Sequence, residues 1–169
     1  MDVGFLSADL GKWNGARPAD VLAVSLWRDV RPLRGAVGLL DWRLCGRLSG
    51  WIESGRLGGG AHEQTLFPTG KVLPWKMALA LGLGDSAAFS EAKFRETVRR
   101  TLDAVRRLSL RTLALALPGR ESDRIAPQRA LEILLEEARV GAVSELTIIE
   151  PPAAQKEMQE ILRKRARGF

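Results

Sequence analysis

The sequence predicts an α/β fold of three layers, in which a mixed, mostly parallel β-sheet carries helices on both faces. Two patterns support this prediction. Several short apolar runs lack polar alternation, as is typical of strands buried on both faces of a sheet. Between these runs lie longer segments whose apolar residues recur at the spacing of amphipathic helices. Because strands and helices alternate along the chain, we expect helices on both sides of the sheet.

The first half of the chain contains three predicted strands and one predicted helix. Residues 20–27 form a run that is typical of a central strand. Over residues 35–54 apolar side chains recur at helical spacing, and Gly55 indicates the helix end. Segments 63–67 and 76–81 flank a stretch that contains prolines and a glycine, which favours two strands joined by a hairpin-like loop. These two strands are expected to pair antiparallel.

The second half repeats the alternation of helix and strand. Ser90 is a predicted helix cap, and the residues after it place apolar side chains on one face and arginines on the other. Residues 111–117 form another strand of the buried kind. A first-turn proline and a following glycine bound a helix predicted over 127–139. Residues 144–149 are the last predicted strand, and 153–166 are the last predicted helix.

Length and composition favour a single domain over residues 1–169, since domains typically contain ~100–200 residues. Within it we expect an irregular segment at 1–18, an α/β core at 20–150, and a basic C-terminal helix and tail at 152–169. No run approaches the ~20 apolar residues of a membrane span. The first residues lack the basic-then-apolar order of a signal peptide. A cytoplasmic location, with no membrane partner, is therefore expected.

The sequence offers little for catalysis. A catalytic zinc site needs about three protein ligands, yet His62 is the only histidine and Cys45 is the only cysteine. Cys45 lies among leucines in a predicted helix, which favours a small buried residue, and His62 is expected to be a partly exposed residue at the start of a strand. A serine hydrolase would need a base and a nucleophile elbow, and the chain lacks that elbow motif. We therefore predict no metal, no cofactor and no catalytic residue.

A glycine turn follows the strand at 76–81 and reads Gly-x-Gly-x-x-Ala. Backbone N–H groups in such a turn before a helix can hold a phosphate. The candidate residues for binding a nucleotide or ADP-ribose ligand are therefore Gly82, Gly84, Asp85 and Ser86. Asp85 would place negative charge inside the turn, and the run at 58–60 precedes a strand instead of a helix. The alternative is that these glycines only permit tight turns.

The net charge of +6 and the pI near 10.2 raise the question of a nucleic-acid partner. The excess basic residues lie on two predicted helices. The candidate contacts are Arg99, Arg100, Arg106, Arg107, Arg163, Lys164, Arg165 and Arg167. Acidic residues are interspersed among them, and the chain has no tyrosine to stack on bases. A solvated helix face is the competing interpretation.

The chain has five tryptophans, which are enriched at binding hot spots. Trp51 fits the apolar stripe of its helix, and Trp27 and Trp75 lie at strand ends. The pattern does not place Trp13 or Trp42 in the core. An exposed apolar patch near them would support self-association or a protein partner.

The order and spacing of several small and apolar motifs resemble those of a known domain. The motifs are Asp20–Val24, Leu33–Ala36 with Leu40-Asp41, Gly46 with Leu48, Gly55–Glu63 and Leu81–Gly84. Together they resemble the amino-terminal domain of the leucyl aminopeptidase family, the two-zinc cytosolic exopeptidases. The similarity covers residues 20 to the final helix and implies a macro-domain-like fold.

The resemblance also bears on function. In that family the metals, their ligands and the catalytic arginine lie in a separate carboxyl-terminal domain, so no catalytic residue carries over to this chain. It implies a non-catalytic, stand-alone relative that acts as a protein-interaction or regulatory module. The alternatives are a nucleic-acid-binding protein that uses the basic helix faces, and a binder of nucleotide or ADP-ribose at the Gly82–Ser86 turn.

Overall fold

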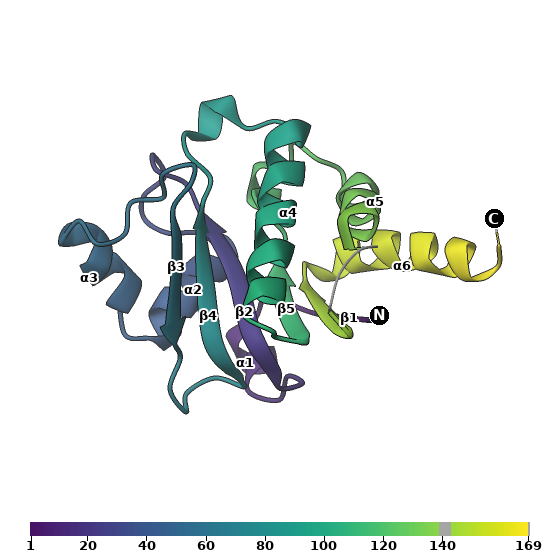
Figure 1. Cartoon of the computed structure of the whole chain (residues 1–169), viewed down its shortest axis with the longest axis horizontal. Coiled ribbons are helices and arrows are strands. Elements are labelled where there is room, and N and C mark those ends of the chain that lie inside the picture. Colours follow the sequence, from purple (N-terminus) through teal and green to yellow (C-terminus); the bar gives the residue numbers. More distant parts are fainter. Residues whose placement is uncertain (139–142, 169) are drawn as a thin grey trace.

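A computed structural model describes residues 1–138 and 143–168 of the chain. Its centre is a six-stranded sheet of order β1-β6-β5-β2-β4-β3 (Figure 1). Every neighbouring pair is parallel except β3 with β4, which are antiparallel as predicted. The strands are β1 (Asp2–Leu6), β2 (Ala19–Leu26), β3 (Gln64–Pro68), β4 (Trp75–Gly82), β5 (Thr112–Ala116) and β6 (Glu145–Ile149).

Helices cover both faces of the sheet, and the predicted fold class is confirmed. One apolar core lies between the sheet and α4, α5 and α6, and the other lies between the sheet and α1, α2 and α3. The helices are α1 (Leu10–Trp13), α2 (Gly35–Arg43), α3 (Arg47–Glu53), α4 (Glu91–Arg107), α5 (Pro127–Glu137) and α6 (Pro152–Ala166), with short 3-10 turns η1 (Ser86–Ala88) and η2 (Arg120–Ser122). The end of the helix predicted over 127–139 falls on residue 139, outside the described residues.

Strand β2 shows why the apolar runs lack polar alternation. Val21 and Ala23 face the core under α4 and α5, whereas Leu22 and Val24 face the core under α2. Successive side chains of a strand point to opposite faces, so both sets must be apolar when both faces are covered.

The prediction that residues 1–18 are irregular is wrong. They contain β1, which pairs parallel with β6 at the sheet edge, and the single-turn helix α1. Asp9 caps α1 by accepting a hydrogen bond from the Gly11 N–H at 2.8 Å. Trp13 is fully buried, with its ring edge-to-face against Trp75 at 5.1 Å between centroids. Trp13 therefore belongs to the core, which its local sequence did not indicate.

The helix predicted over residues 35–54 is in fact two helices. The chain adopts positive φ angles of 56° at Cys45 and 78° at Gly46, which end α2 and redirect the backbone into α3. The Asp41 carboxylate holds the break, because its Oδ1 accepts from the Leu48 N–H at 2.8 Å. Cys45 is exposed at this turn, so the prediction that it is buried is also wrong.

The buried position of Trp13 leads to a stability prediction. Trp13→Ala removes a fully buried indole and leaves a cavity, so it should lower the free energy of unfolding by about 3–5 kcal/mol. Urea denaturation followed by circular dichroism measures this loss. Trp42→Ala is the matched control; because Trp42 is 71% exposed, its change should stay within about 0.5 kcal/mol. Equal losses in the two variants would contradict the assignment of Trp13 to the core.

Candidate functional site

The glycines of the Gly82–Ser86 turn permit close packing of two segments. The Gly82 N–H donates to the Glu63 carbonyl and the Gly84 N–H to the Gly59 carbonyl, each at 2.9 Å. A Cβ atom built on Gly82 would lie only 1.8 Å from the Gly60 carbonyl oxygen. Only a residue without a side chain fits there, which gives this glycine a structural role that needs no ligand.

The polar atoms of the same turn also have partners within the chain. Asp85 accepts from the Arg28 guanidinium, with 2.9 Å between Nε and Oδ1. The backbone N–H and hydroxyl of Ser86 donate to the two carboxylate oxygens of Asp29 at 2.9 and 2.8 Å. These hydrogen bonds lower the pKa of Asp29. A phosphate bound at this turn would have to displace Asp29, and nucleotide binding here stays a prediction.

The backbone N–H groups of the glycine run at 58–60 also have a partner within the chain. Its consecutive N–H groups point at one carboxylate, that of Glu63, at 2.9 Å from Gly58, 2.5 Å from Gly59 and 3.1 Å from Gly60. Such a concave arrangement of N–H groups is an anion-binding nest. In this protein the bound anion is a side chain of the chain itself.

A crevice lies where β5 and β6 end, and we call it the strand-end crevice. It has a volume of about 280 Å³ and is lined by the last residues of these strands, by η2 and by the start of α2. Parallel strands share a carboxyl edge, and ligands of open α/β sheets bind outside that edge. The sequence analysis did not identify this site. The available signal was a charged residue, Glu150, directly after the strand at 144–149.

The strand-end crevice contains a buried ion pair. Glu150 is 2% exposed, and its Oε1 accepts from Arg120 Nε at 3.0 Å. Arg120 also donates to the Ile125 carbonyl. Glu121 accepts a hydrogen bond from the Trp27 indole at 2.8 Å. Burial raises the pKa of Glu150, although the attraction of Arg120 opposes the shift.

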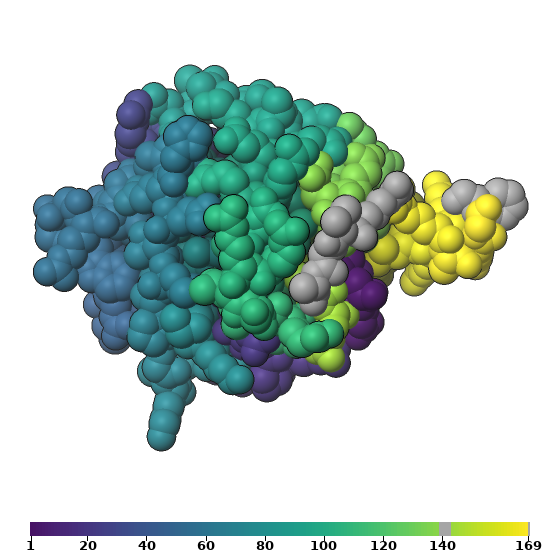
Figure 2. All heavy atoms as spheres, viewed as in Figure 1, coloured from purple at the N-terminus to yellow at the C-terminus, as the bar shows by residue number. Residues whose placement is uncertain are grey.

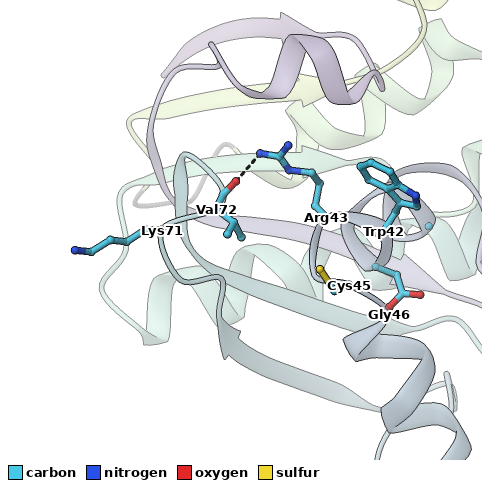
Figure 3. Close-up of a pocket in the computed structure, with 8 residues that line it drawn as sticks. Trp42, Arg43, Cys45, Gly46, Lys71 and Val72 are labelled. Atoms are coloured by element: carbon cyan, nitrogen blue, oxygen red, sulfur yellow. Dashed lines mark hydrogen bonds between the residues drawn. The ribbon is translucent and has the colours of Figure 1, made fainter.

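A second hollow of about 800 Å³ lies beside the break between α2 and α3. We call its rim of Trp42, Arg43, Cys45, Lys71 and Val72 the Trp42 surface (Figure 3). Trp42 is 71% exposed and Val72 is 48% exposed. Figure 3 shows Arg43 reaching the Val72 carbonyl, at 2.7 Å, while Lys71 points away from Arg43. The exposed patch expected near Trp13 and Trp42 thus involves Trp42 and not Trp13.

The other tryptophans lie at or near the core. Trp27 is 5% exposed and follows β2, and Trp75 is 1% exposed and begins β4. Trp51 is half-buried and packs edge-to-face on Phe67 at 5.0 Å. His62 is exposed just before β3. Within residues 1–138 and 143–168, no three His, Cys, Asp or Glu side chains form a group suited to a metal ion.

The predicted nucleic-acid contacts differ in their surroundings. On α4, Arg99 pairs with Glu137, Arg106 pairs with Asp103, and Arg100 donates to the carbonyls of Ala61 and Glu63. The remaining candidates are exposed and form no ion pair with any other described residue: Arg107, Arg163, Lys164, Arg165 and Arg167. The last four lie at the end of α6. The first part of α6 packs on the core, whereas its end projects from the rest of the molecule (Figure 1 and Figure 2).

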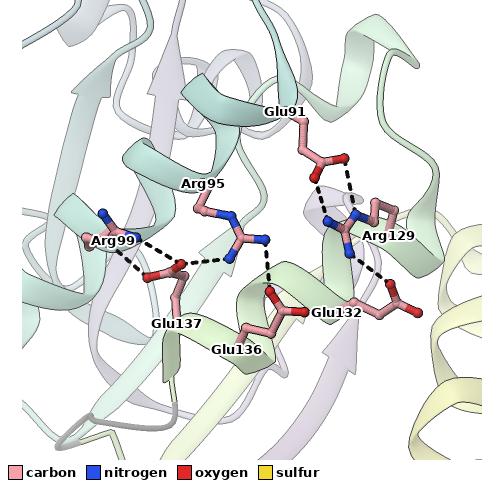
Figure 4. A network of polar contacts seen from close by, with 7 residues as sticks. All are labelled: Glu91, Arg95, Arg99, Arg129, Glu132, Glu136 and Glu137. Carbon is pink, nitrogen blue, oxygen red and sulfur yellow. Dashed lines mark hydrogen bonds and ion pairs between the residues drawn. The ribbon is translucent and has the colours of Figure 1, made fainter.

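The network of charged side chains on α4 and α5 consists of two adjacent groups of ion pairs, one around Arg95 and one around Arg129 (Figure 4). Arg95 contacts both Glu136 and Glu137, at 2.8 and 2.9 Å. Arg129 contacts Glu91 at 2.6 Å. Hydrogen bonds from Arg99 and Arg95 lower the pKa of Glu137 despite some desolvation. The arginines of this face therefore tie two helices together.

The fold and the crevice define a macrodomain-like α/β protein. The structure resembles a Trypanosoma brucei macrodomain solved in complex with ADP-ribose, with a TM-score of 0.72 and 15% identity over 95% of this chain and 68% of that chain. It also resembles a tomato leucine aminopeptidase mutant, with a TM-score of 0.62 and 16% identity over 94% of this chain and 35% of that chain.

The sequence itself identifies the family. The profile of the cytosol aminopeptidase family, N-terminal domain, matches residues 23–144, so the chain belongs to this family and the resemblance seen in the sequence is confirmed. A probable cytosol aminopeptidase of Alkaliphilus metalliredigens (strain QYMF) is 25% identical over 122 residues. That match covers 72% of this chain and 24% of the relative. The chain thus spans about a quarter of the curated relative's length.

In the described parts of the chain, no helix combines the length and apolar character required to cross a bilayer.

The α4–α5 network predicts a pH dependence of stability. The pKa of Glu137 is lowered in the folded protein, so its stabilising effect is present above its unfolded pKa and is lost as the pH falls through its folded pKa. Glu137→Gln should therefore lower the free energy of unfolding by about 1 kcal/mol at pH 7. The loss should be smaller at pH 3, which lies below the ordinary pKa of a glutamate carboxyl. Urea denaturation at both pH values measures this difference. A loss of equal size at pH 3 would contradict the stabilising role assigned to the ionised Glu137 carboxylate.

Proposed function

We propose that the chain is a non-catalytic interaction module of the cytoplasm, and that the Trp42 surface binds a protein partner. The observation that carries this proposal is the exposure of Trp42, the most exposed large hydrophobic side chain among the described residues. Tryptophan is enriched at binding hot spots, and exposed apolar patches commonly mark interaction sites. The family match also supports this proposal, because the matching profile describes the N-terminal domain of the aminopeptidases.

The charges beside Trp42 indicate the chemistry of the partner. Among the described residues, Arg43 donates only to neutral acceptors, the Asn14 side chain and the Val72 carbonyl. Lys71 has no ion-pair partner within the described part of the chain. The carboxylate of Asp41 is held by Leu48 and Ser49 at the start of α3. The Trp42 surface is therefore cationic, and an acidic segment with an apolar side chain would complement it.

Site-specific photo-crosslinking tests this function. A photoreactive amino acid at position 72 should form a discrete adduct in cells, and Trp42→Ala should reduce that adduct about tenfold or more, since hot-spot truncations cost at least ~2 kcal/mol. Position 108 is the matched control, because Leu108 is also exposed, at 44%, but lies at the end of α4. Mass spectrometry then distinguishes a second copy of the chain from another protein. Equal crosslinking from positions 72 and 108 would contradict the proposal.

The basic end of α6 supports nucleic-acid binding as a second candidate function. Its four cations are exposed and form no ion pair with any described residue. In filter binding with single-stranded DNA, each phosphate-contacting cation should add about 0.7 to the slope of log affinity against log salt. Replacing residues 163, 164, 165 and 167 by glutamine should therefore flatten the slope, whereas Arg106→Gln should not. Binding that does not depend on salt would refute this candidate.

A further inference from the structure

We propose that the strand-end crevice binds a small organic cation, a primary ammonium group carried on a short aliphatic body. The charged groups of its lining support this choice of ligand. The carboxylates of Glu121, Asp123 and Glu150 line the crevice together with one guanidinium, that of Arg120. Carboxylates thus outnumber cationic side chains in the lining, and a cationic ligand would balance the excess negative charge.

Glu150 provides the acceptor for the ammonium group. Its side chain is 2% exposed, and only Oε1 is hydrogen-bonded, to Arg120. Oε2 has no donor among the described residues. Every fully buried side-chain oxygen or nitrogen in this part of the chain has a partner. Oε2 is therefore not fully buried, and the crevice is the cavity that Glu150 lines. An N–H donor placed beside Oε2 would complete its hydrogen bonding.

Anions are disfavoured at the same place. The start of α2 lines the crevice, and a helix N-terminus attracts negative charge. Glu121 already supplies that charge, since its Oε2 lies 3.9 Å from the position of a Cβ atom on Gly35. A pyrophosphate would meet Glu121 and Asp123 at close range. The ligand class proposed for this chain therefore differs from the ADP-ribose bound to the Trypanosoma brucei macrodomain.

The rest of the lining limits the size and character of the ligand. Ala116 and Ile149 end β5 and β6, and Leu117 follows β5; all three add apolar side chains to the lining. The volume of about 280 Å³ is near the lower limit of ~300 Å³ for small-molecule pockets. A short alkyl chain fits these limits.

The Trp27 indole gives a direct test by nuclear magnetic resonance. Its N–H donates to Glu121, so its resonance reports on the crevice. Trp42, at the other end of α2, is the internal control. We expect n-butylammonium chloride to shift the Trp27 signal saturably and to leave the Trp42 signal in place. The uncharged n-butanol and the anionic butyrate are matched probes that should shift neither signal saturably.

Variants test whether the shift of the Trp27 signal arises from binding in the crevice. Asp123→Asn changes an exposed carboxylate of the lining and should weaken butylammonium binding about threefold. Asp103→Asn changes an exposed carboxylate on α4, outside the crevice, and should leave binding unchanged. Glu150→Gln should abolish saturation, and its indole spectrum establishes that it is folded.

A second pair of probes identifies the source of the ammonium group. Alanylalanine amide has a free amino terminus, and its N-acetylated form lacks one. Saturable binding of the free dipeptide alone supports the proposal and indicates a peptide amino terminus, whereas binding of butylammonium alone supports it and indicates a free amine. The proposal is overturned if neither amine shifts Trp27, if butyrate or ADP-ribose shifts it more strongly, or if Asp123→Asn leaves the affinity unchanged.

Discussion

The parallel pairing of β2 with both β4 and β5 is the constraint on which the other features depend. Parallel strands end at the same edge of a sheet, so the segments that follow β2, β4 and β5 meet there. This pairing brings the Trp27 indole to Glu121, although the two residues are 94 positions apart in the sequence. The same edge carries the contact between Asp29 and Ser86.

The protein's own carboxylates occupy the positions where its backbone could bind an anion. Glu63 fills the nest of N–H groups at 58–60, Asp29 holds the N–H of Ser86, and Glu121 lies beside the start of α2. Each contact satisfies backbone donors without an external ligand. A macrodomain-like fold can therefore keep its anion-binding backbone geometry and use it internally, to fix the loops against one another.

The sequence predicted the elements that local pattern determines and missed those that depend on distant contacts. The central strands were predictable because both of their faces are apolar. Strand β1 was not, because it is short and partly exposed and pairs with β6, which is far along the chain. The break between α2 and α3 was hidden because Leu44 and Leu48 keep helical spacing across it. Arg120 and Glu150 follow different strands, so their pairing becomes visible only once the strand order is known.

The close approach of Gly82 to the Gly60 carbonyl has a consequence for comparing this protein with its relatives. Because no side chain fits at position 82, a homologue with a larger residue there must carry the segment equivalent to 58–61 along a different path. Arg100 is anchored to the carbonyls of Ala61 and Glu63, so its contact would be lost as well. The residue type at this one position thus indicates whether the loop geometry described for this protein can be transferred to a relative known only from its sequence.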